Sequence, residues 1–544
     1  MFAPDVPRGP LPPGARWSFD ADSLRLAGFF TLSELLARLP GVYVARGGFF
    51  GQAENVLYAG RGPAALELYW DGIPYVPLGR DSLYLDPARV SLAPLERVEV
   101  SRLPGVLRVY LVTRRQASTH AASSVGVSSG DRNLTRYVGR FARRWRSGAG
   151  LSFAFDKNAI DGAAGTSSTG FNSENLWLHG EVTRAGRFGI SYQMLGSSWE
   201  RDPAAGLVDH WRFGRTDQIL RLFVSPRPDG LGARFQLAAA HATAKRDSAV
   251  PTRYSRVMAL DAGLAARRAS VDATVRLGDA ARPLQLEARG SWTPLGGLSG
   301  AGVTLSAEAR QAEYRGGRVG RRAIGQIGFL LPLGFSLRGE AVWSRDLQAA
   351  SLTTVPLQRT LDLNGAVRWD GRWATLEVGA GRRDGFLPFL APAGLRTIAD
   401  LHATPTTNTL TVYGSLRPAG WVTVSGWYAD PLDGGGDFEP PHHARVSATF
   451  FSRFLRVFRS GIFALRGDVA VESWSGWNTG IDSAGATLRL KGSSFLDFNI
   501  GLQIGDVTAF WTRRNANGRA ATYVPGLAYP RNLYFFGVRW DFRN

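Results

Sequence analysis

Apolar and polar residues alternate along many short segments from about Thr119 to the C-terminus. Phe463, Leu465, Gly467, Val469 and Val471 alternate with Ala464, Arg466, Asp468, Ala470 and Glu472, and residues 336–344 and 360–369 repeat the pattern. Successive side chains of a β-strand point to opposite faces, so each segment predicts a strand with one apolar and one polar face. The last such segment, residues 534–542, carries aromatic residues at alternate positions.

The connections between these segments alternate in length. Short turns occur at residues 184–187, 226–230, 369–372 and 417–420, and longer connections occur at 157–172, 198–215, 345–356, 384–395, 430–443 and 473–482. This alternation is typical of a transmembrane β-barrel. We therefore predict an all-β fold, an antiparallel barrel of about 22 strands over residues 118–544 with its long loops on the cell exterior. A soluble β-sandwich would alternate similarly but rarely over so long a chain.

Composition supports a barrel rather than a helical membrane protein. The 544 residues include 65 Gly, 16 Trp, 15 Tyr and 30 Phe, which suit short strands, turns and aromatic girdles. The sequence has no apolar run as long as a helical membrane span. A mean hydropathy of −0.11 is compatible with a barrel, because only alternate strand residues face lipid.

Residues 20–115 show a different pattern. Leu32, Leu35, Leu36 and Leu39 form the apolar face of a short helix that Pro40-Gly41 ends. Tyr58-Ala-Gly-Arg61-Gly62 follows, then a strand turn at Tyr69-Trp-Asp71-Gly72, then Leu95-Glu-Arg97-Val-Glu-Val100. In order and spacing these motifs resemble the plug domain of TonB-dependent outer-membrane receptors. The resemblance implies a small α+β plug inside the barrel lumen.

The resemblance divides the chain into three segments. We expect a Pro-rich linker at residues 1–19, the plug domain at 20–115 and the barrel at 118–544. Residues 1–14 show neither an apolar leader pattern nor a recognisable TonB box, and residues 101–114 give the plug a shorter end than the family pattern. The alternating aromatics that end at Phe542 resemble the assembly signal of outer-membrane barrels, although Arg543 and Asn544 follow.

The resemblance also implies ion pairs between plug and barrel. Arg61 and Arg97 match plug positions where the family carries arginines that pair with barrel glutamates. On strand face and location we assign Glu340 and Glu377 as their partners. The alternative is that both arginines are simply solvated.

Ligand contact in this family comes from the plug apex and the outer loops. On that basis the candidate ligand-binding residues are Phe49, Phe50, Tyr75, Arg80 and Tyr84, and plain plug packing is the alternative for the aromatic ones. Residues 430–443 cluster acids and histidines, which makes them candidates for a hard cation, with an ordinary solvated loop as the alternative. These candidate metal ligands are Asp433, Asp437, Glu439, His442 and His443.

Several function classes lose support from the sequence. The net charge of +19 comes almost entirely from arginines spread along the chain, which disfavours a nucleic-acid-binding patch. The absence of Cys excludes disulfides and thiol catalysis. The seven histidines show no HExxH spacing, and there is no GxSxG motif, so we expect neither an enzyme nor a cofactor. An enzyme using lumen carboxylates such as Asp468 or Glu472 remains the third alternative.

The alternation predicts a membrane barrel, and the resemblance to TonB-dependent receptors implies a monomeric receptor and transporter of the cell outer membrane. It would capture a scarce solute, such as a metal chelate, a vitamin or an oligomeric nutrient, and import it by TonB-energised plug rearrangement. The alternative is an uncoupled plugged barrel that acts as a surface receptor or scaffold for a partner protein. The expected partners are outer-membrane lipid and lipopolysaccharide, the TonB complex, the solute and a surface lipoprotein, with no nucleic acid.

Overall fold

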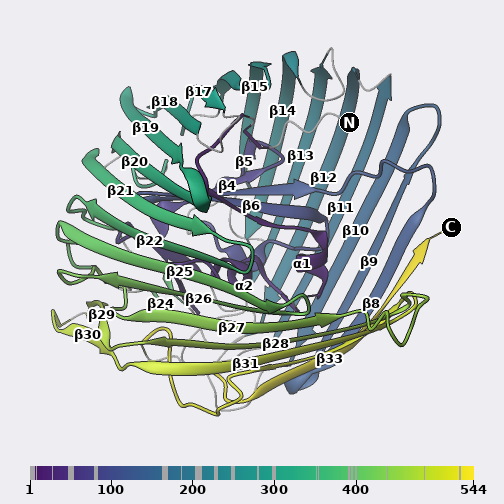
Figure 1. Ribbon diagram of the computed structural model, residues 1–544. Helices are drawn as coiled ribbons and strands as arrows, with labels where there is room; N and C mark the ends of the chain where they lie inside the picture. Colours follow the sequence, from purple (N-terminus) through teal and green to yellow (C-terminus); the bar gives the residue numbers. More distant parts are fainter. Residues whose placement is uncertain are drawn as a thin grey trace.

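A large closed β-barrel surrounds a small N-terminal domain in the computed structural model of the chain (Figure 1). The structure describes residues 6–7, 9–26, 28–46, 54–78, 84–161, 170–184, 187–202, 211–225, 231–246, 252–278, 281–296, 302–350, 352, 355–389, 392–393, 396–397, 401–437, 439–482, 484–525 and 529–543. Within these ranges no helix is long and apolar enough to cross a bilayer.

The barrel wall consists of 22 antiparallel strands among the described residues, which confirms the predicted fold class. They are β8 (Ala122–Gly130), β9 (Leu134–Arg144), β10 (Ala149–Ile160), β11 (Phe171–Arg184), β12 (Phe188–Arg201), β13 (Trp211–Val224), β14 (Gly232–Arg246), β15 (Arg253–Ala265), β16 (Ala269–Leu277), β17 (Leu284–Gly296), β18 (Gly302–Tyr314), β19 (Arg318–Leu330), β20 (Phe335–Asp346), β21 (Gln358–Asp370), β22 (Ala374–Arg383), β25 (Thr407–Ala419), β26 (Val422–Pro431), β27 (His443–Ser452), β28 (Phe463–Trp474), β31 (Ser493–Ile504), β32 (Val507–Arg514) and β33 (Leu533–Arg543).

The last strand closes the ring by pairing with the first. Val538 of β33 lies opposite Val127 of β8, and every other barrel strand pairs with its neighbour in the chain order. A closed ring leaves no unpaired strand edge, so every backbone polar group within the wall can be satisfied inside a bilayer.

The two faces of the wall follow the alternation in the sequence. On β33 the outward side chains of Phe536, Val538 and Trp540 are half exposed, whereas the inward Phe535 is buried. Outward apolar positions like these recur around the ring and form a lipid-compatible belt. The inward positions are mostly polar and face the N-terminal domain.

The two ends of the barrel differ as predicted. At one end the strands are joined by short connections such as residues 145–148, 371–373 and 420–421, and we call it the short-turn end. At the opposite end, the long-loop end, residues 384–406 and 475–492 form long connections. These contain the small hairpins β23 (Pro392–Ala393) with β24 (Arg396–Thr397), and β29 (Trp477–Ile481) with β30 (Thr487–Leu490).

The domain inside the barrel is built on a five-stranded sheet, drawn in purple at the centre of Figure 1. Its order is β1-β6-β7-β4-β5, with β4 and β7 parallel. The strands are β1 (Arg16–Phe19), β4 (Leu66–Trp70), β5 (Ile73–Pro74), β6 (Leu95–Leu103) and β7 (Val106–Thr113). A hairpin of β2 (Val42–Ala45) with β3 (Asn55–Tyr58), and the helices α1 (Ala21–Leu26) and α2 (Leu32–Leu36), complete it. We call this domain the plug.

Local signals in the sequence explain these elements. Thr31 caps α2 by accepting a hydrogen bond from the Glu34 amide, and Gly41 has a φ of +71° where the chain turns away from the helix. The β4–β5 turn has φ values of +45° at Asp71 and +80° at Gly72. Residues 16–19, which we expected in the N-terminal linker, instead pair with β6 as strand β1, because Trp17 and Phe19 pack against the plug core.

Candidate functional site

Arg61 links the plug to the barrel wall. It follows a tight turn in which Ala59 and Gly60 have φ values of +49° and +63°. A Cβ atom at Gly60 would lie 2.8 Å from Cγ2 of Thr404 on the barrel side, and the positive φ also favours glycine at this close approach. The Arg61 guanidinium donates to both carboxylate oxygens of Asp362 on β21, with Nε 3.2 Å from Oδ2. Both side chains are buried.

A second contact centres on Glu67 of β4. Its carboxylate accepts hydrogen bonds from the plug Arg108 at 3.0 Å and from the barrel Arg310 and Arg322 at 2.7 and 2.5 Å. Arg108 in turn donates two 2.8 Å hydrogen bonds to Glu308 of β18. Burial disfavours the charged form of Glu67, but the guanidinium groups outweigh it and hold its pKa well below the usual range. The Glu67 carboxylate therefore stays ionised at neutral pH and keeps its charge for the arginines of plug and barrel.

A third contact joins the plug to β13. The carboxylate of Asp71 accepts hydrogen bonds from the amide and the hydroxyl of Thr113, which fixes the β4–β5 turn within the plug. Arg221 of β13 reaches this turn and donates a 2.5 Å hydrogen bond to the Asp71 carbonyl oxygen. Arg221 thereby holds the turn against the barrel.

Apolar packing dominates the contact with β10–β15. One continuous cluster joins the plug core to inward side chains of these strands, and we call their inner face the apolar wall. The barrel members are Ala154, Trp177, Leu195, Ile219, Ala238 and Ala259, and the plug members include Trp70, Ile73, Tyr75, Val90 and Leu92. Burial of this area contributes most of the attachment of the plug to the apolar wall. Single hydrogen bonds add to it: Arg215 of β13 donates to the Val76 carbonyl oxygen at 2.8 Å, and Ser91 donates to Asp156 of β10 at 2.8 Å.

The inner faces of β16–β22, β25 and β26 contact the plug differently, and we call them the polar wall. The Arg61 and Glu67 contacts lie there. Apolar contact includes one small cluster of Leu103 and Val106 with Ile324 and Val342. The N-terminal segment, residues 6–15, also runs along this wall, since the Pro13 carbonyl accepts a 2.7 Å hydrogen bond from Arg338.

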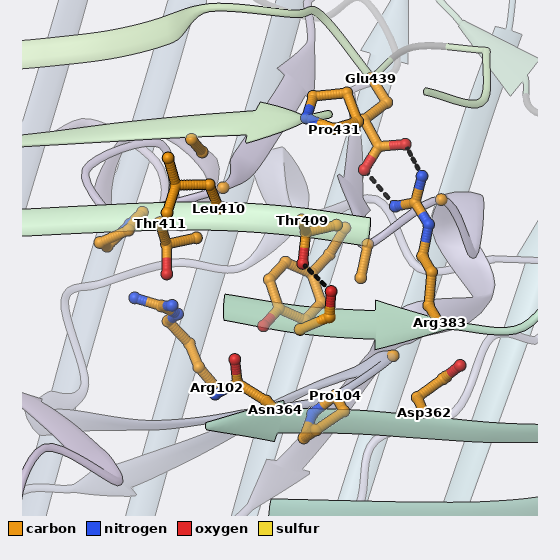
Figure 2. A pocket seen from close by; sticks show the side chains of 18 of the residues that line it. Arg102, Pro104, Asp362, Asn364, Arg383, Thr409, Leu410, Thr411, Pro431 and Glu439 are labelled. Atoms are coloured by element: carbon orange, nitrogen blue, oxygen red, sulfur yellow. Dashed lines mark hydrogen bonds and ion pairs between the residues drawn. The ribbon is translucent and has the colours of Figure 1, made fainter. Parts of the chain in front are cut away.

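A cavity of about 100 Å³ separates the plug from the polar wall. Plug residues 40–43, 57–60 and 102–105 line one side, and strands β20–β22, β25 and β26 line the other. Figure 2 shows Arg102 extending from the plug toward Thr411, and the ion pair of Arg383 with Glu439 at the other end of the cavity. This volume is well below the roughly 300–1,000 Å³ of an ordinary ligand pocket, so no nutrient-sized passage is open at this place.

The structure corrects three of the four residues assigned to plug–barrel ion pairs. Arg97 contacts Glu99 of its own strand at 2.7 Å, because residues two apart on a strand share a face. Glu340 lies 3.5 Å from Arg338, and Glu377 lies 2.9 Å from the same arginine, so both pair within the barrel. Arg61 does reach a barrel carboxylate, but that carboxylate is Asp362.

The candidate ligand residues are only partly within the described ranges. Phe49, Phe50 and Arg80 lie outside them. Tyr75 is buried, with the Arg215 guanidinium 3.8 Å above its ring, so it packs between plug and β13. Tyr84 is buried as well. The two described tyrosines therefore do not form an open binding surface.

The candidate metal ligands each have a separate partner. Asp433 accepts from Asn408, Asp437 contacts His402, and Glu439 pairs with Arg383. His442 lies 2.7 Å from Asp430, and His443 lies 3.0 Å from Glu472. In the described part of the chain, no three such side chains converge as a metal site would require.

Sequence reasoning missed Glu67, Arg108 and Asp362. One signal could have found the first two: each is a lone charge in an otherwise apolar strand, LELYW for β4 and VLRVYLVT for β7. A charge in such a strand needs a partner when buried, and the nearest place to find one is the lumen wall.

A closed barrel filled by a separately folded domain defines a plugged membrane barrel. The comparisons agree with this class: a family model of the TonB-dependent receptor plug domain matches residues 12–108. Residues 12–108 are therefore a TonB-dependent receptor plug domain, and the chain has the plug-and-barrel architecture of TonB-dependent outer-membrane receptors. No curated protein matches the sequence.

Solved structures share the fold over nearly the whole chain. The siderophore receptor PirA from Acinetobacter baumannii is 11% identical with a TM-score of 0.72, covering 97% of this chain and 98% of that one. The FrpB iron transporter from Neisseria meningitidis is 10% identical with a TM-score of 0.71, covering 97% and 99%. A mutant of the ferric enterobactin receptor PfeA from Pseudomonas aeruginosa, in complex with enterobactin, is 11% identical with a TM-score of 0.72, covering 97% and 99%. At these identities the likeness concerns the fold.

Proposed function

We propose that the protein is an outer-membrane receptor that captures a scarce solute at its long-loop end and imports it by moving its plug, energised by TonB. The observation that carries the proposal is that the plug fills the lumen and is latched to the wall by buried ion pairs. Such a pore conducts a nutrient only after the plug moves. The solved structures of the same fold include receptors and a transporter named for siderophores and iron, which supports a metal chelate as the solute.

The plug's two kinds of contact suggest where the passage opens. Separating apolar surfaces exposes them to water, which costs free energy from the first step. The apolar wall therefore favours a plug that stays attached. Ion pairs are different, because separated Arg and carboxylate groups regain hydration in a wet lumen. We infer that the plug separates from the polar wall and remains on the apolar wall.

The N-terminal segment is the part of the plug on which a pulling force would act first. It contacts Ser270, Gly328 and Arg338, which lie near the short-turn ends of β16, β19 and β20. Residues 6–15 belong to no described strand, so a pull from the short-turn side removes them a few contacts at a time. Their removal would widen the gap along the polar wall before the plug sheet is disturbed.

An uptake assay tests the proposal. The chain is expressed in a Gram-negative host that lacks its own receptors and is offered radiolabelled ferric enterobactin, cobalamin and an oligosaccharide in turn. We expect accumulation of one of them, abolished when an uncoupler dissipates the inner-membrane potential. Uptake that is insensitive to the uncoupler, or no uptake of any solute despite correct assembly, would favour an uncoupled surface receptor.

A further inference from the structure

The connection between β27 and β28, residues 453–462, is unusually long for the short-turn end and is folded. The amides of Val457 and Phe458 donate to the Phe454 carbonyl oxygen at 2.9 and 2.8 Å, forming a helical turn. Phe454 packs edge-on against Phe463, with 5.5 Å between ring centroids, and Phe458 stacks on the same ring at 4.8 Å. Phe463 points outward from β28, so the connection is anchored to the lipid-facing side of the barrel.

This connection exposes apolar and cationic side chains together. Val457 is 72% exposed, and Leu455 and Ile462 are 56% and 52% exposed. Arg453, Arg456 and Arg459 are also exposed, and the structure records no ion pair for them within its described ranges. Aqueous solvent alone does not favour three large apolar side chains at one tip, whereas the boundary between headgroups and acyl chains suits both kinds of side chain.

The two preceding turns at the short-turn end repeat the combination. Trp421 is 53% exposed in the β25–β26 turn, next to the exposed Arg417. Trp373 is 54% exposed in the β21–β22 turn, with the Arg372 guanidinium 4.8 Å above its ring.

We call residues 371–373, 417–421 and 453–462 the cationic rim, because the nearby acids do not neutralise its arginines. Asp370 is held by Arg368 at 2.7 Å, and Asp506 in the next turn is exposed. Three consecutive turns and the adjoining end of β25 thus present five exposed arginines close to aromatic residues, with the exposed Asp506 in the next turn.

We propose that this rim binds anionic glycerophospholipids in the leaflet on the short-turn side. Guanidinium groups recognise phosphate through paired hydrogen bonds, and the aromatic rings occupy the interface just below. A membrane leaflet fits better than a protein partner, because the exposed apolar residues continue the lipid-facing surface of Phe450 and Phe463. The inference rests on the barrel's place in the outer membrane, which is part of the proposed function.

Native mass spectrometry of the full chain tests this assignment. The protein in detergent is titrated with dioctanoyl phosphatidylglycerol and, separately, with dioctanoyl phosphatidylcholine. We expect tighter binding of phosphatidylglycerol, weakened by added salt. The variant R453Q/R456Q/R459Q should lose about fivefold or more of the phosphatidylglycerol affinity and little of the phosphatidylcholine affinity. A second variant, Leu455→Ser with Val457→Ser, should weaken both lipids.

The matched control is R253Q/R315Q/R321Q, which removes the same charge from exposed positions at the long-loop end. Its phosphatidylglycerol affinity should stay within twofold of wild type. Equal binding of the two lipids, an equal loss in both triple variants, or complete competition by inorganic phosphate would overturn the assignment. Solute uptake by the R453Q/R456Q/R459Q variant is measured in parallel, since uptake that persists alongside failed lipid preference separates this inference from the proposed function.

Discussion

The ion pair of Arg61 with Asp362 is the sharpest test of plug attachment at the level of single residues. Asp362→Asn leaves the Arg61 guanidinium buried without its charge partner, which costs about 3–5 kcal/mol for a pair of this kind. We expect the plug of this variant to detach at a lower urea concentration than in wild type. Conductance of KCl across planar bilayers, recorded during a urea titration, measures that detachment.

Asp370→Asn is the control for this prediction. Asp370 also pairs with an arginine, but its side chain is 44% exposed, so its loss should cost about 0–1 kcal/mol. Both variants lose one negative charge from β21. If they shifted the urea threshold equally, the buried pair would not be a latch.

Glu54 gives the plug a pH-dependent stability. Burial is the largest influence and raises the pKa of this carboxyl to about 7, with Asp86 adding to the rise. A pKa raised in the folded state means that the contribution to stability is complete below the unfolded pKa of 4.5 and is lost as pH rises toward 7. Hydrogen exchange of plug amides should therefore quicken from pH 4.5 to 7 beyond its intrinsic rate. Glu54→Gln should remove that part of the pH dependence, and an unchanged profile in Glu54→Gln would refute the assignment.

At the scale of elements, the two walls should release the plug in a fixed order. Residues 57–62 and 102–105 face the polar wall, whereas residues 70–75 and 90–93 join the apolar cluster. Because ion pairs hydrate and apolar contacts do not, hydrogen exchange in rising urea should first reach the segments on the polar wall. Simultaneous exchange, or exchange that begins at residues 70–75, would contradict the inferred hinge.

The N-terminal segment should act as a seal. Deletion of residues 1–14 leaves β1 and the whole plug sheet in place but removes residues 9–14, which contact β16, β19 and β20. We expect a higher resting KCl conductance than in wild type, with an unchanged melting temperature for the barrel. Equal conductance would show that residues 6–15 do not close a route.

Alternation in the sequence was sufficient to predict which side faces the lumen in the strands at residues 336–344, 360–369, 463–472 and 534–542, but not the height of a residue in the wall. Glu340 and Asp362 both face inward, yet Glu340 lies opposite Asn364, two residues along β21 from Asp362. The stagger of strands around a barrel sets that height, and it depends on all the pairings together. The plug motifs could therefore identify Arg61 as a linking residue, while its partner, 301 positions away, required the structure.

The same limit explains why the sequence led to the wrong partner for Arg97. Its partner Glu99 was visible two residues away on the same strand face, but the sequence alone did not show whether Arg97 would pair within its own strand or across to the barrel. Arg97 pairs with Glu99 of its own strand. The candidate metal residues do not converge for a related reason, because clustering along a loop does not determine where each side chain finds its hydrogen bond.

At the scale of the whole molecule, the account describes a barrel whose plug remains on one wall while a passage forms along the other. The chain contains no cysteine, so an introduced pair forms a unique disulfide. A Cβ atom at Gly41 of the plug would lie 3.8 Å from Cβ of Ala429 on β26, the usual spacing in a disulfide. Ser91 of the plug hydrogen-bonds Asp156 of β10 at 2.8 Å, which offers a link to the opposite side.

The most direct measurement compares KCl conductance of these two cross-linked variants at urea concentrations that open the wild-type plug. Gly41→Cys with Ala429→Cys should stay closed when oxidised and open when reduced. The single variant Gly41→Cys, measured under both redox conditions, accounts for the backbone strain of a side chain at a φ of +71° and should open in both. Ser91→Cys with Asp156→Cys, joined by a short bis-maleimide, should open as its single-cysteine controls do. If the oxidised Gly41–Ala429 variant opened like wild type while the Ser91–Asp156 link held the pore closed, the passage would lie on the other wall and the account would be wrong.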